Sequence, residues 1–294
     1  MIDYVMKQKP KAFICQDYIV VDIFDFGAKF QIPFIAVTDG CTGGQRTETG
    51  SQLLCHISRI ETLKYLEEWD LGRPDTGFGR SDLLEILNRI QNKLTAISTE
   101  LSFNYDQLLA TLQFLFIIDN HVYGIRSGDG VMFTFDKKKI IRTSVIEYTP
   151  NMPNYLAYRT NPVAWRDLRT TVHGDPYRPC FKTVTTYEST ATEPTTTEDR
   201  QDYFEITFID EELSPDLTHI GLASDGVESY MNESSNQGIP VWGLIKELSE
   251  IKNPEGNFLV RRFQKMDKGY HSAGFENKDD VAIAMIDLEA YRRL

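Results

Sequence analysis

Two long amphipathic segments restrict the folds open to this chain more than any other feature of its sequence. In residues 47–69, and again in the segment that follows Ser81, apolar residues recur every three or four positions, as on one face of a helix. Ser81 is a candidate N-cap for the second helix, and Asp82 lies in its expected first turn. Because each apolar face must be covered, both helices are expected to pack on one common surface.

Apolar and β-branched segments flank the two helices and are expected to supply that surface. The expected strands are residues 18–24, 33–38, 111–118, 121–127 and 130–135. The dipeptide Asp119–Asn120 suits a tight turn between the third and fourth of them. The order of two strands, two helices and three strands lacks the regular alternation of a parallel sheet, so it predicts helices that cover a sheet.

Residues from about 149 to 203 differ from the rest of the chain. Pro, Asn, Arg and Thr dominate there, and periodic apolar positions are scarce. We expect a Thr- and Pro-rich surface insertion or mobile flap within a single domain, residues 1–294, rather than a separate folded module. Strands are expected again at 203–209, in "THIGLASDGV" and in "DDVAIAMIDL", with a helix that begins near Pro240.

The bulk composition narrows the classes of function. Hydrophobic residues make up 41% of the chain and charged residues 25%, so a sizeable core can form. A net charge of -12 argues against nucleic-acid and anionic-membrane partners, which need clustered Lys and Arg. No stretch approaches the roughly 18 apolar residues of a membrane span, and the four cysteines show no metal-ligand or disulfide-framework spacing. We therefore expect a soluble, cytoplasmic protein, with its oligomeric state open.

Five aspartates stand where expected strands begin or end. They are Asp17 in "ICQDYIVV", Asp39 in "IAVTDG", Asp129 in "GIRSGDGVMF", Asp225 in "IGLASDG" and Asp279 in "KDDVAIAMI". A single Asp–Gly pair indicates only a turn. Side chains at the ends of several strands can meet at one edge of a sheet, where carboxylates repel one another unless a cation neutralises them. The pattern therefore favours a site for a hard divalent cation, Mg²⁺ or Mn²⁺.

Sequence blocks in a fixed order carry a family resemblance. The blocks are "CQDYIVV", "AVTDGCTGG" followed by "TETGSQLL", "LLATLQFLFI", "RSGDGVMF", "LASDGV" and "DDVAIAMI". Over roughly residues 12–135 and 203–288, this order resembles the metal-dependent type-2C Ser/Thr protein phosphatases, the PPM family, and in particular their compact bacterial-type branch. The resemblance implies an α+β fold, a four-layer α-β-β-α sandwich of two antiparallel sheets flanked by helices.

The resemblance also implies the chemistry of the site. Two Mn²⁺ or Mg²⁺ ions would hold a water that attacks phosphoserine or phosphothreonine of a protein substrate, and many members bind a third, weaker ion. The implied metal ligands are Asp17, Asp39, the carbonyl of Gly40, Asp129, Asp225 and Asp279. Asp39 matches the aspartate that bridges both metals, so Asp39 and Asp225 are the implied catalytic residues. Asp17 matches an aspartate that acts directly or through water, and Asp129 matches the one associated with the third metal.

The chain departs from the family pattern at two places. Many members carry an arginine that holds the substrate phosphate, and here that position is Ala12, with Lys11 beside it. A lysine would supply a point charge but no bidentate contact. Many members also carry a histidine where this chain has Cys41. Thr111, in a block that resembles the strand beneath the site, is assigned to packing rather than chemistry.

Two alternatives to a protein phosphatase stay open. The departures at Ala12 and Cys41 favour a pseudophosphatase, which would keep the fold as a phosphoprotein-binding or regulatory module, whereas the retained aspartates oppose it. The second alternative is a metal-dependent hydrolase of small phosphate esters.

Three arginines of the 149–203 segment could contact an acidic phosphopeptide, although an ordinary exposed surface is the simpler interpretation. They are Arg159, Arg166 and Arg169.

Overall fold

One five-stranded antiparallel sheet contains most of the strands expected in the first half of the chain. The computed structural model describes all residues except 11, 13, 28–30, 45, 73–76, 150–151, 175–179, 190–193 and 294. Within these residues the sheet runs in the order β10 (Thr207–Glu212), β5 (His121–Ser127), β4 (Leu112–Ile118), β3 (Gln31–Thr38) and β2 (Tyr18–Asp25). The predicted turn between β4 and β5 is confirmed, since Asp119 and Asn120 have φ values of 47° and 61°.

A second, seven-stranded antiparallel sheet joins both ends of the chain. Its order is β1 (Ile2–Lys7), β15 (Val281–Asp287), β11 (Leu217–Ala223), β6 (Gly130–Asp136), β7 (Ile141–Thr149), β8 (Phe181–Ser189) and β9 (Thr195–Gln201). A small sheet contains β12 (Tyr230–Asn232), β13 (Gln237–Gly238) and β14 (Glu276–Asn277). Because β1 pairs with β15, with Ile2 opposite Ile286, the sandwich is completed only by the last strand.

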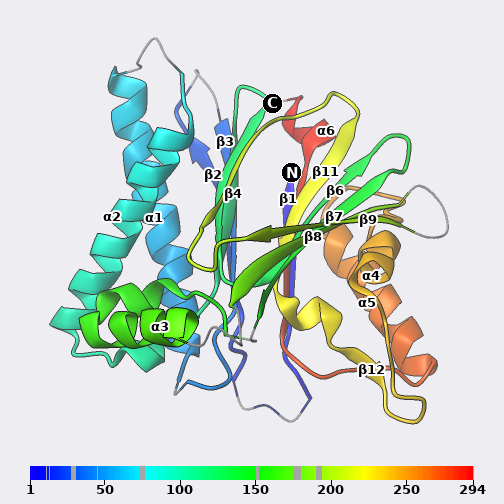
Figure 1. Cartoon of the computed structure of the whole chain (residues 1–294). Coiled ribbons are helices and arrows are strands. Elements are labelled where there is room, and N and C mark those ends of the chain that lie inside the picture. Colours follow the sequence, from blue (N-terminus) through cyan, green and yellow to red (C-terminus); the bar gives the residue numbers. More distant parts are fainter. Residues whose placement is uncertain are drawn as a thin grey trace.

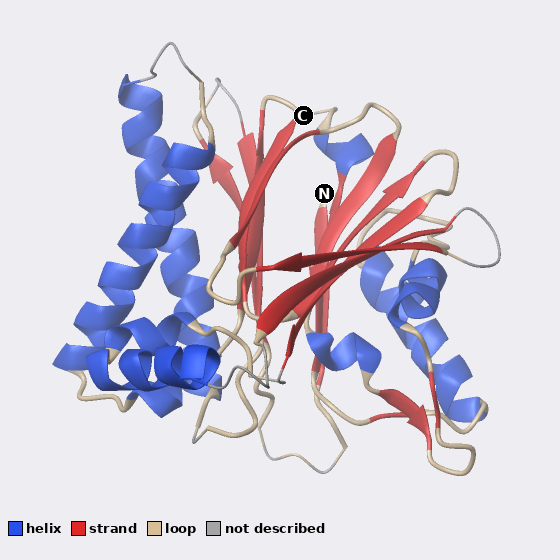
Figure 2. Cartoon of the chain, in the orientation of Figure 1, coloured by secondary structure: helices blue, strands red, loops and turns tan. Residues whose placement is uncertain are grey.

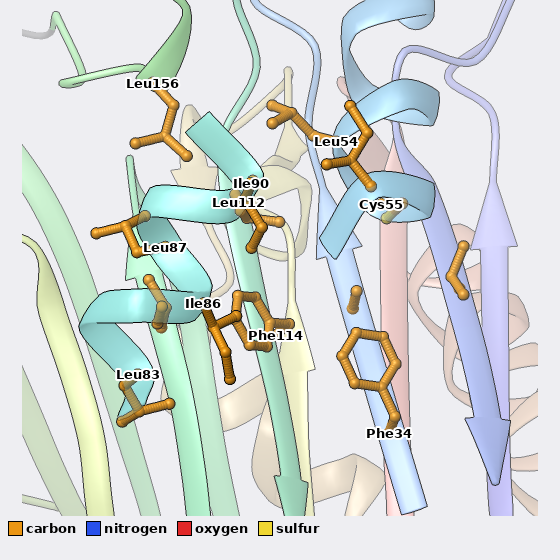
Figure 3. Packing of buried hydrophobic residues seen from close by; sticks show 14 of the residues in the cluster. Phe34, Leu54, Cys55, Leu83, Ile86, Leu87, Ile90, Leu112, Phe114 and Leu156 are labelled. Atoms are coloured by element: carbon orange, nitrogen blue, oxygen red, sulfur yellow. The ribbon is translucent and has the colours of Figure 1, made fainter. Parts of the chain in front are cut away.

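Helices cover the outer faces of both sheets, which confirms the predicted α-β-β-α sandwich (Figures 1 and 2). Helices α1 (Glu48–Gly72) and α2 (Arg80–Glu100) lie on the five-stranded sheet, and α4 (Val241–Leu248) and α5 (Phe258–Ser272) on the other. Figure 3 shows Phe114 beside Ile86 of α2, and Phe34 and Leu54 of α1 belong to the same apolar cluster. The predicted cap at Ser81 was wrong: Gly79 is the N-cap, and its amide donates to Asp82 Oδ2 at 2.8 Å.

The two sheets are joined by an apolar layer and by buried polar bonds. Apolar side chains of β3 and β4, such as Ile35 and Leu115, pack against those of β11 and β15. The polar bonds come from Arg126, which donates to the Ser144 carbonyl at 3.1 Å, and from Lys182, which donates to Thr207 Oγ1 at 2.9 Å. Among the described residues, no helix is both long and apolar enough to cross a membrane.

The segment around residues 149–203 forms more regular structure than its composition suggested. It contains the short 3-10 helix η2 (Leu156–Thr160), α3 (Pro162–Gly174) and strands β8 and β9. Leu168 and Val172 of α3 are buried against Tyr148 and Tyr203. The threonine-rich stretches of the segment form the paired strands β8 and β9 rather than loops. Its role as an insertion in a single domain stays a prediction.

Candidate active site

The register of the strands brings the five aspartates to one end of the sandwich. Asp17 directly precedes β2 and Asp39 directly follows β3, and the neighbouring residues Tyr18 and Thr38 are paired. Asp225 begins the short 3-10 helix η3 (Asp225–Glu228) just after β11, and Asp279 lies just before β15. Because β11 and β15 are antiparallel neighbours, the end of one lies beside the beginning of the other.

Asp129 completes the group from the turn between β5 and β6. Strand β6 lies beside β11, with Val131 opposite Ala223, so this turn is at the same end as Asp225. The sequence-predicted residues thus come from both sheets and from five different strand ends. Asp17 is buried, whereas the other four aspartates are partly exposed.

Asp39 lies at the electrostatic centre of this group. Its carboxyl group lies close to those of both Asp17 and Asp225. Burial and the neighbouring charges of Asp17, Asp225 and Asp129 raise the pKa of Asp39 well above its usual range. Burial also raises the pKa of Asp17 to about 7. The carboxylates therefore repel one another.

The carboxylates on the seven-stranded side show the same effect. Burial, together with the charge of Asp279, raises the pKa of Asp225. Burial and the charge of Asp225 raise the pKa of Asp129 to about 7. Sequence reasoning missed Glu228. Its pKa is raised to about 7 by burial and by the charges of Glu147, Asp225 and Asp129. Its position three residues after Asp225, in "SDGVE", was the available signal.

Backbone contacts hold Asp39 and Gly40 in place. The Asp39 amide donates to Thr111 Oγ1 at 2.9 Å, and the Thr111 amide donates to the Asp39 carbonyl at 2.8 Å. Thr111 thus positions Asp39, which goes beyond the packing role expected for it. A Cβ on Gly40 would lie 2.9 Å from backbone atoms of Thr47, so the close approach of the two segments requires glycine. The role of the Gly40 carbonyl as a ligand stays a prediction.

A buried polar network supports the strand ends beneath the aspartates. Gln113 Nε2 donates to the Ala223 carbonyl at 2.9 Å, and Arg126 Nη2 donates to the Gly130 carbonyl at 2.8 Å. Arg126 Nε also donates to Gln113 Oε1 at 3.0 Å, which couples the two contacts. On the other side, the Ser224 hydroxyl donates to Asp17 Oδ2 at 2.7 Å. Sequence reasoning missed these supporting residues, because the partners of Gln113 and Ser224 lie 110 and 207 residues away along the chain and Arg126 bonds across the two sheets.

The adjacent aspartates Asp279 and Asp280 have different environments. Asp280 is buried and accepts hydrogen bonds from the backbone amides of Lys9 and Gln16, at 2.7 and 2.6 Å. Asp279 instead receives the Lys9 ammonium at 3.0 Å. Burial opposes the charge of Lys9, but the carboxylates of Asp279, Asp280 and Asp39 outweigh it and raise the pKa of Lys9. A cation of the chain itself thus lies at the edge of the group.

The two departures from the family pattern have different surroundings. Ala12 is partly exposed in the loop after β1, and Lys11 lies outside the described residues. The side chain of Cys41 lies close to the hydroxyl of Tyr155, which is also near Asp39 and Asp129. Burial and these neighbours raise the pKa of Tyr155 far above its usual value. Tyrosine and cysteine therefore occupy the place where a histidine was expected.

The donor set fits a hard divalent cation in its chemistry more than in its present geometry. Within the part of the chain that the structure describes, no three His, Cys, Asp or Glu side chains are already arranged around a common ion position. The available donors are carboxylate oxygens, which Mg²⁺ and Mn²⁺ prefer. Burial and mutual repulsion raise the pKa values of these carboxylates. A divalent cation would remove this repulsion.

Comparisons with known proteins agree with the fold. The structure is similar to the serine/threonine phosphatase Stp1 from Staphylococcus aureus, at 12% identity over 97% of this chain and 94% of that one (TM-score 0.53). It is also similar to the Mycobacterium tuberculosis phosphatase PstP/Ppp, at 15% identity over 98% and 97% (TM-score 0.50). A third similar structure is a Caenorhabditis elegans sex-determining protein, at 13% identity over 99% and 66% (TM-score 0.56).

These identities are low, so the structural likeness by itself shows the fold alone. No match was found among curated protein sequences. The sequence model described as protein phosphatase 2C, however, matches residues 11–266, which is most of the chain. The chain therefore belongs to the protein phosphatase 2C family.

Proposed function

We propose that this chain is a metal-dependent protein serine/threonine phosphatase. The observation that supports it most is the convergence of five mutually repelling aspartates from both sheets, in a member of the phosphatase 2C family. The proposed metal ligands are Asp17, Asp39, the carbonyl of Gly40, Asp129, Asp225 and Asp279. Asp39 and Asp225, whose carboxyl groups lie close together, are the proposed catalytic residues.

Divalent cations, Mn²⁺ or Mg²⁺, would lower the pKa of a shared water and offset negative charge on the phosphoryl oxygens. The residues of the chain would bind the substrate and orient it for this chemistry. Lys9 carries a positive charge at the edge of the site, where it can contact phosphoryl oxygens in place of the missing arginine. The Tyr155 hydroxyl and the Cys41 thiol are the proton-bearing groups near the expected leaving group.

Metal binding and turnover must be measured side by side to test this function. Mn²⁺ is titrated by calorimetry into wild type, Asp39→Ala and the control Asp22→Ala, and hydrolysis of phosphoserine and phosphothreonine peptides is followed. Asp22 lies on β2 but pairs with Arg59 on the outer face. We expect wild type and the control to bind Mn²⁺ and hydrolyse the peptides, and Asp39→Ala to lose both. A wild-type protein that binds no Mn²⁺ or Mg²⁺ overturns the proposal.

A pseudophosphatase is the second candidate. Ala12 and Cys41 favour it, as does the ion pair that already engages Asp279 with Lys9. The same experiment separates the two candidates: metal binding without turnover of varied phosphosubstrates supports the binding module. Faster turnover of nucleotides than of phosphopeptides would instead indicate a hydrolase of small phosphate esters.

We also propose that the protein acts as a single domain in a reducing compartment such as the cytoplasm. Its four cysteines, Cys15, Cys41, Cys55 and Cys180, are free thiols, which suits such a compartment. The pairing of β1 with β15 supports a single domain, because the first and last strands belong to the same sheet.

A further inference from the structure

Helix η2 and helix α3 carry three arginines around one tryptophan. Trp165, Arg166, Arg169, Thr170 and His173 lie on one side of α3 and line an open hollow of about 400 Å³. The guanidinium group of Arg159 lies over the ring of Trp165, 5.1 Å from its centre. The hollow therefore combines positive charge with a flat aromatic surface.

These arginines are poorly neutralised by the rest of the protein. Arg166 approaches only the adjacent Asp167, at 3.5 Å, and the two side chains are 72% and 67% exposed. Within the described residues, Arg169 makes no ion pair or hydrogen bond, and the buried Nε of Arg159 has no hydrogen-bond partner. Burial lowers the pKa of Arg159, because no carboxylate offsets its desolvation.

Several arginines elsewhere in the structure have carboxylate partners, whereas Arg126 and Arg292 donate to backbone carbonyls. Arg89 contacts Glu68 and Glu85, Arg142 contacts Glu188, and Arg262 contacts Glu247 and Glu250. The chain as a whole has a net charge of -12, so carboxylates are abundant. An unneutralised group of guanidinium ions in such a protein indicates that the neutralising carboxylates come from another molecule.

The hollow is connected to the aspartate group through η2. Tyr155, directly before η2, contacts Cys41 and lies near Asp39 and Asp129. Tyr158 packs against Tyr155, and Arg159 follows it. In Figure 1, α3 lies toward the same end of the sandwich at which β11 runs into η3. A ligand in the hollow would therefore lie on the same side of the molecule as the candidate active site.

We propose that this surface of η2 and α3 binds an acidic segment of the phosphoprotein substrate, next to the phosphorylated residue. The proposal rests on the function proposed above. Guanidinium groups match carboxylates of Asp and Glu bidentately, and the Trp165 ring offers an apolar surface for the peptide between them. Such docking would also offset the repulsion between an acidic substrate and the aspartate group. The surface thus selects substrates with acidic residues beside the phosphosite.

Two phosphopeptides of equal length test the proposal, one with Glu and Asp beside the phosphorylated residue and one with Gln and Asn there. Their affinities are measured by fluorescence anisotropy with wild type, with the double variant Arg166→Gln/Arg169→Gln, and with the control Arg142→Gln. Arg142 is exposed on β7 and pairs with Glu188. We expect wild type and the control to bind the acidic peptide about five- to tenfold more tightly, with a preference that falls as salt is raised, and the double variant to lose most of this preference.

Equal affinity of wild type for both peptides, or an undiminished preference in the double variant, overturns the proposal. Equally tight binding of a single-stranded oligonucleotide of the same charge also overturns it, since the surface would then select charge alone. Hydrolysis of para-nitrophenyl phosphate is measured in parallel with Mn²⁺. A protein that binds the acidic peptide selectively but hydrolyses no phosphate ester contradicts the phosphatase function and leaves the docking surface intact.

Discussion

At the scale of single residues, Asp39 concentrates the repulsion within the aspartate group. The change Asp39→Asn removes one carboxyl group, keeps the shape of the side chain and offers an amide donor to the neighbouring Asp17. We expect it to stabilise the metal-free protein against urea by on the order of 1 kcal/mol, because the folded state loses repulsion that the unfolded chain does not have. We also expect Mn²⁺ to stabilise wild type but not the variant.

Asp22→Asn is the matched control, since it removes a carboxylate of β2 that has a partner in Arg59. This change is expected to be neutral or slightly destabilising and to keep the response to Mn²⁺. A loss of stability in metal-free Asp39→Asn, or stabilisation of that variant by Mn²⁺, would contradict the arrangement described here.

Lys9 is the second residue with a testable electrostatic role. Its ammonium lies 3.0 Å from Asp279 Oδ1 and must leave this oxygen if a metal binds there. The change Lys9→Met is therefore expected to tighten Mn²⁺ binding about three- to tenfold in calorimetric titrations. Lys7→Met, which disrupts the comparable pair of Lys7 with Asp267, should leave Mn²⁺ affinity unchanged. Weaker binding by Lys9→Met would show that Lys9 supports the site instead.

At the scale of elements, the contact between η3 and β15 fixes the position of Asp225. A Cβ on Gly226 would lie 1.6 Å from the Asp280 carbonyl oxygen, so one of the two backbones must move. We expect Gly226→Ala to destabilise the protein by about 3 kcal/mol or more in urea unfolding. Because Asp225 and Asp280 would be displaced together, the variant should also bind Mn²⁺ more weakly.

Gly269→Ala in α5 provides the comparison for this substitution. A Cβ on Gly269 would meet nothing within 4 Å, and alanine favours a helix more than glycine does. This change is expected to stabilise the protein by about 0.5–1 kcal/mol. Similar unfolding free energies for the two variants would mean that the close approach at Gly226 is relieved without cost.

The same scale shows why some elements were predictable from the sequence and others were not. Strands β3 and β4 are mostly apolar, since they are buried on both faces, and their ends at Asp39 and Thr111 were visible in the sequence. Strand β1 was missed because its pattern is inverted: Asp3 is buried, whereas Tyr4 and Met6 are 47% and 38% exposed. Asp3 Oδ2 is satisfied by the Leu259 amide at 2.7 Å, a partner that no local pattern reveals.

The candidate site likewise contains residues that were predictable from the sequence and residues that were not. Its aspartates were predictable, because a carboxylate at the end of an apolar strand is conspicuous within a few residues of sequence. Its supports were not, because Arg126 and Gln113 act across the two sheets and Tyr155 approaches Cys41 from the 149–203 segment. Such contacts depend on strand order and register, which follow from packing of the whole chain.

At the scale of the whole molecule, Lys182 is one of the few polar groups that join the two sheets. It is buried on β8, and its ammonium donates to the Glu205 carbonyl at 2.8 Å and to Thr207 Oγ1 at 2.9 Å. Burial lowers the pKa of Lys182 to about 8, from 10.5 in an unfolded chain. Below pH 8 the folded protein therefore holds a charge in a poorly solvated position, and this charge weakens the attachment of β8 to the opposite sheet.

The sign of the pH dependence follows from these two pKa values. Between about pH 8 and 10.5 the unfolded chain keeps the proton of Lys182 and the folded protein releases it, so stability from this group rises with pH. The free energy of unfolding of wild type, relative to Lys182→Met, is expected to increase by up to about 1.4 kcal/mol per pH unit over this range. Urea unfolding at pH 7.5, 8.5 and 9.5 measures this difference. The control is Lys93→Met, at an exposed position on α2, for which the difference from wild type should not change with pH. A wild-type advantage that stays constant or falls as the pH rises would show that the ammonium is solvated, and that the sheets are joined at β8 by apolar packing alone.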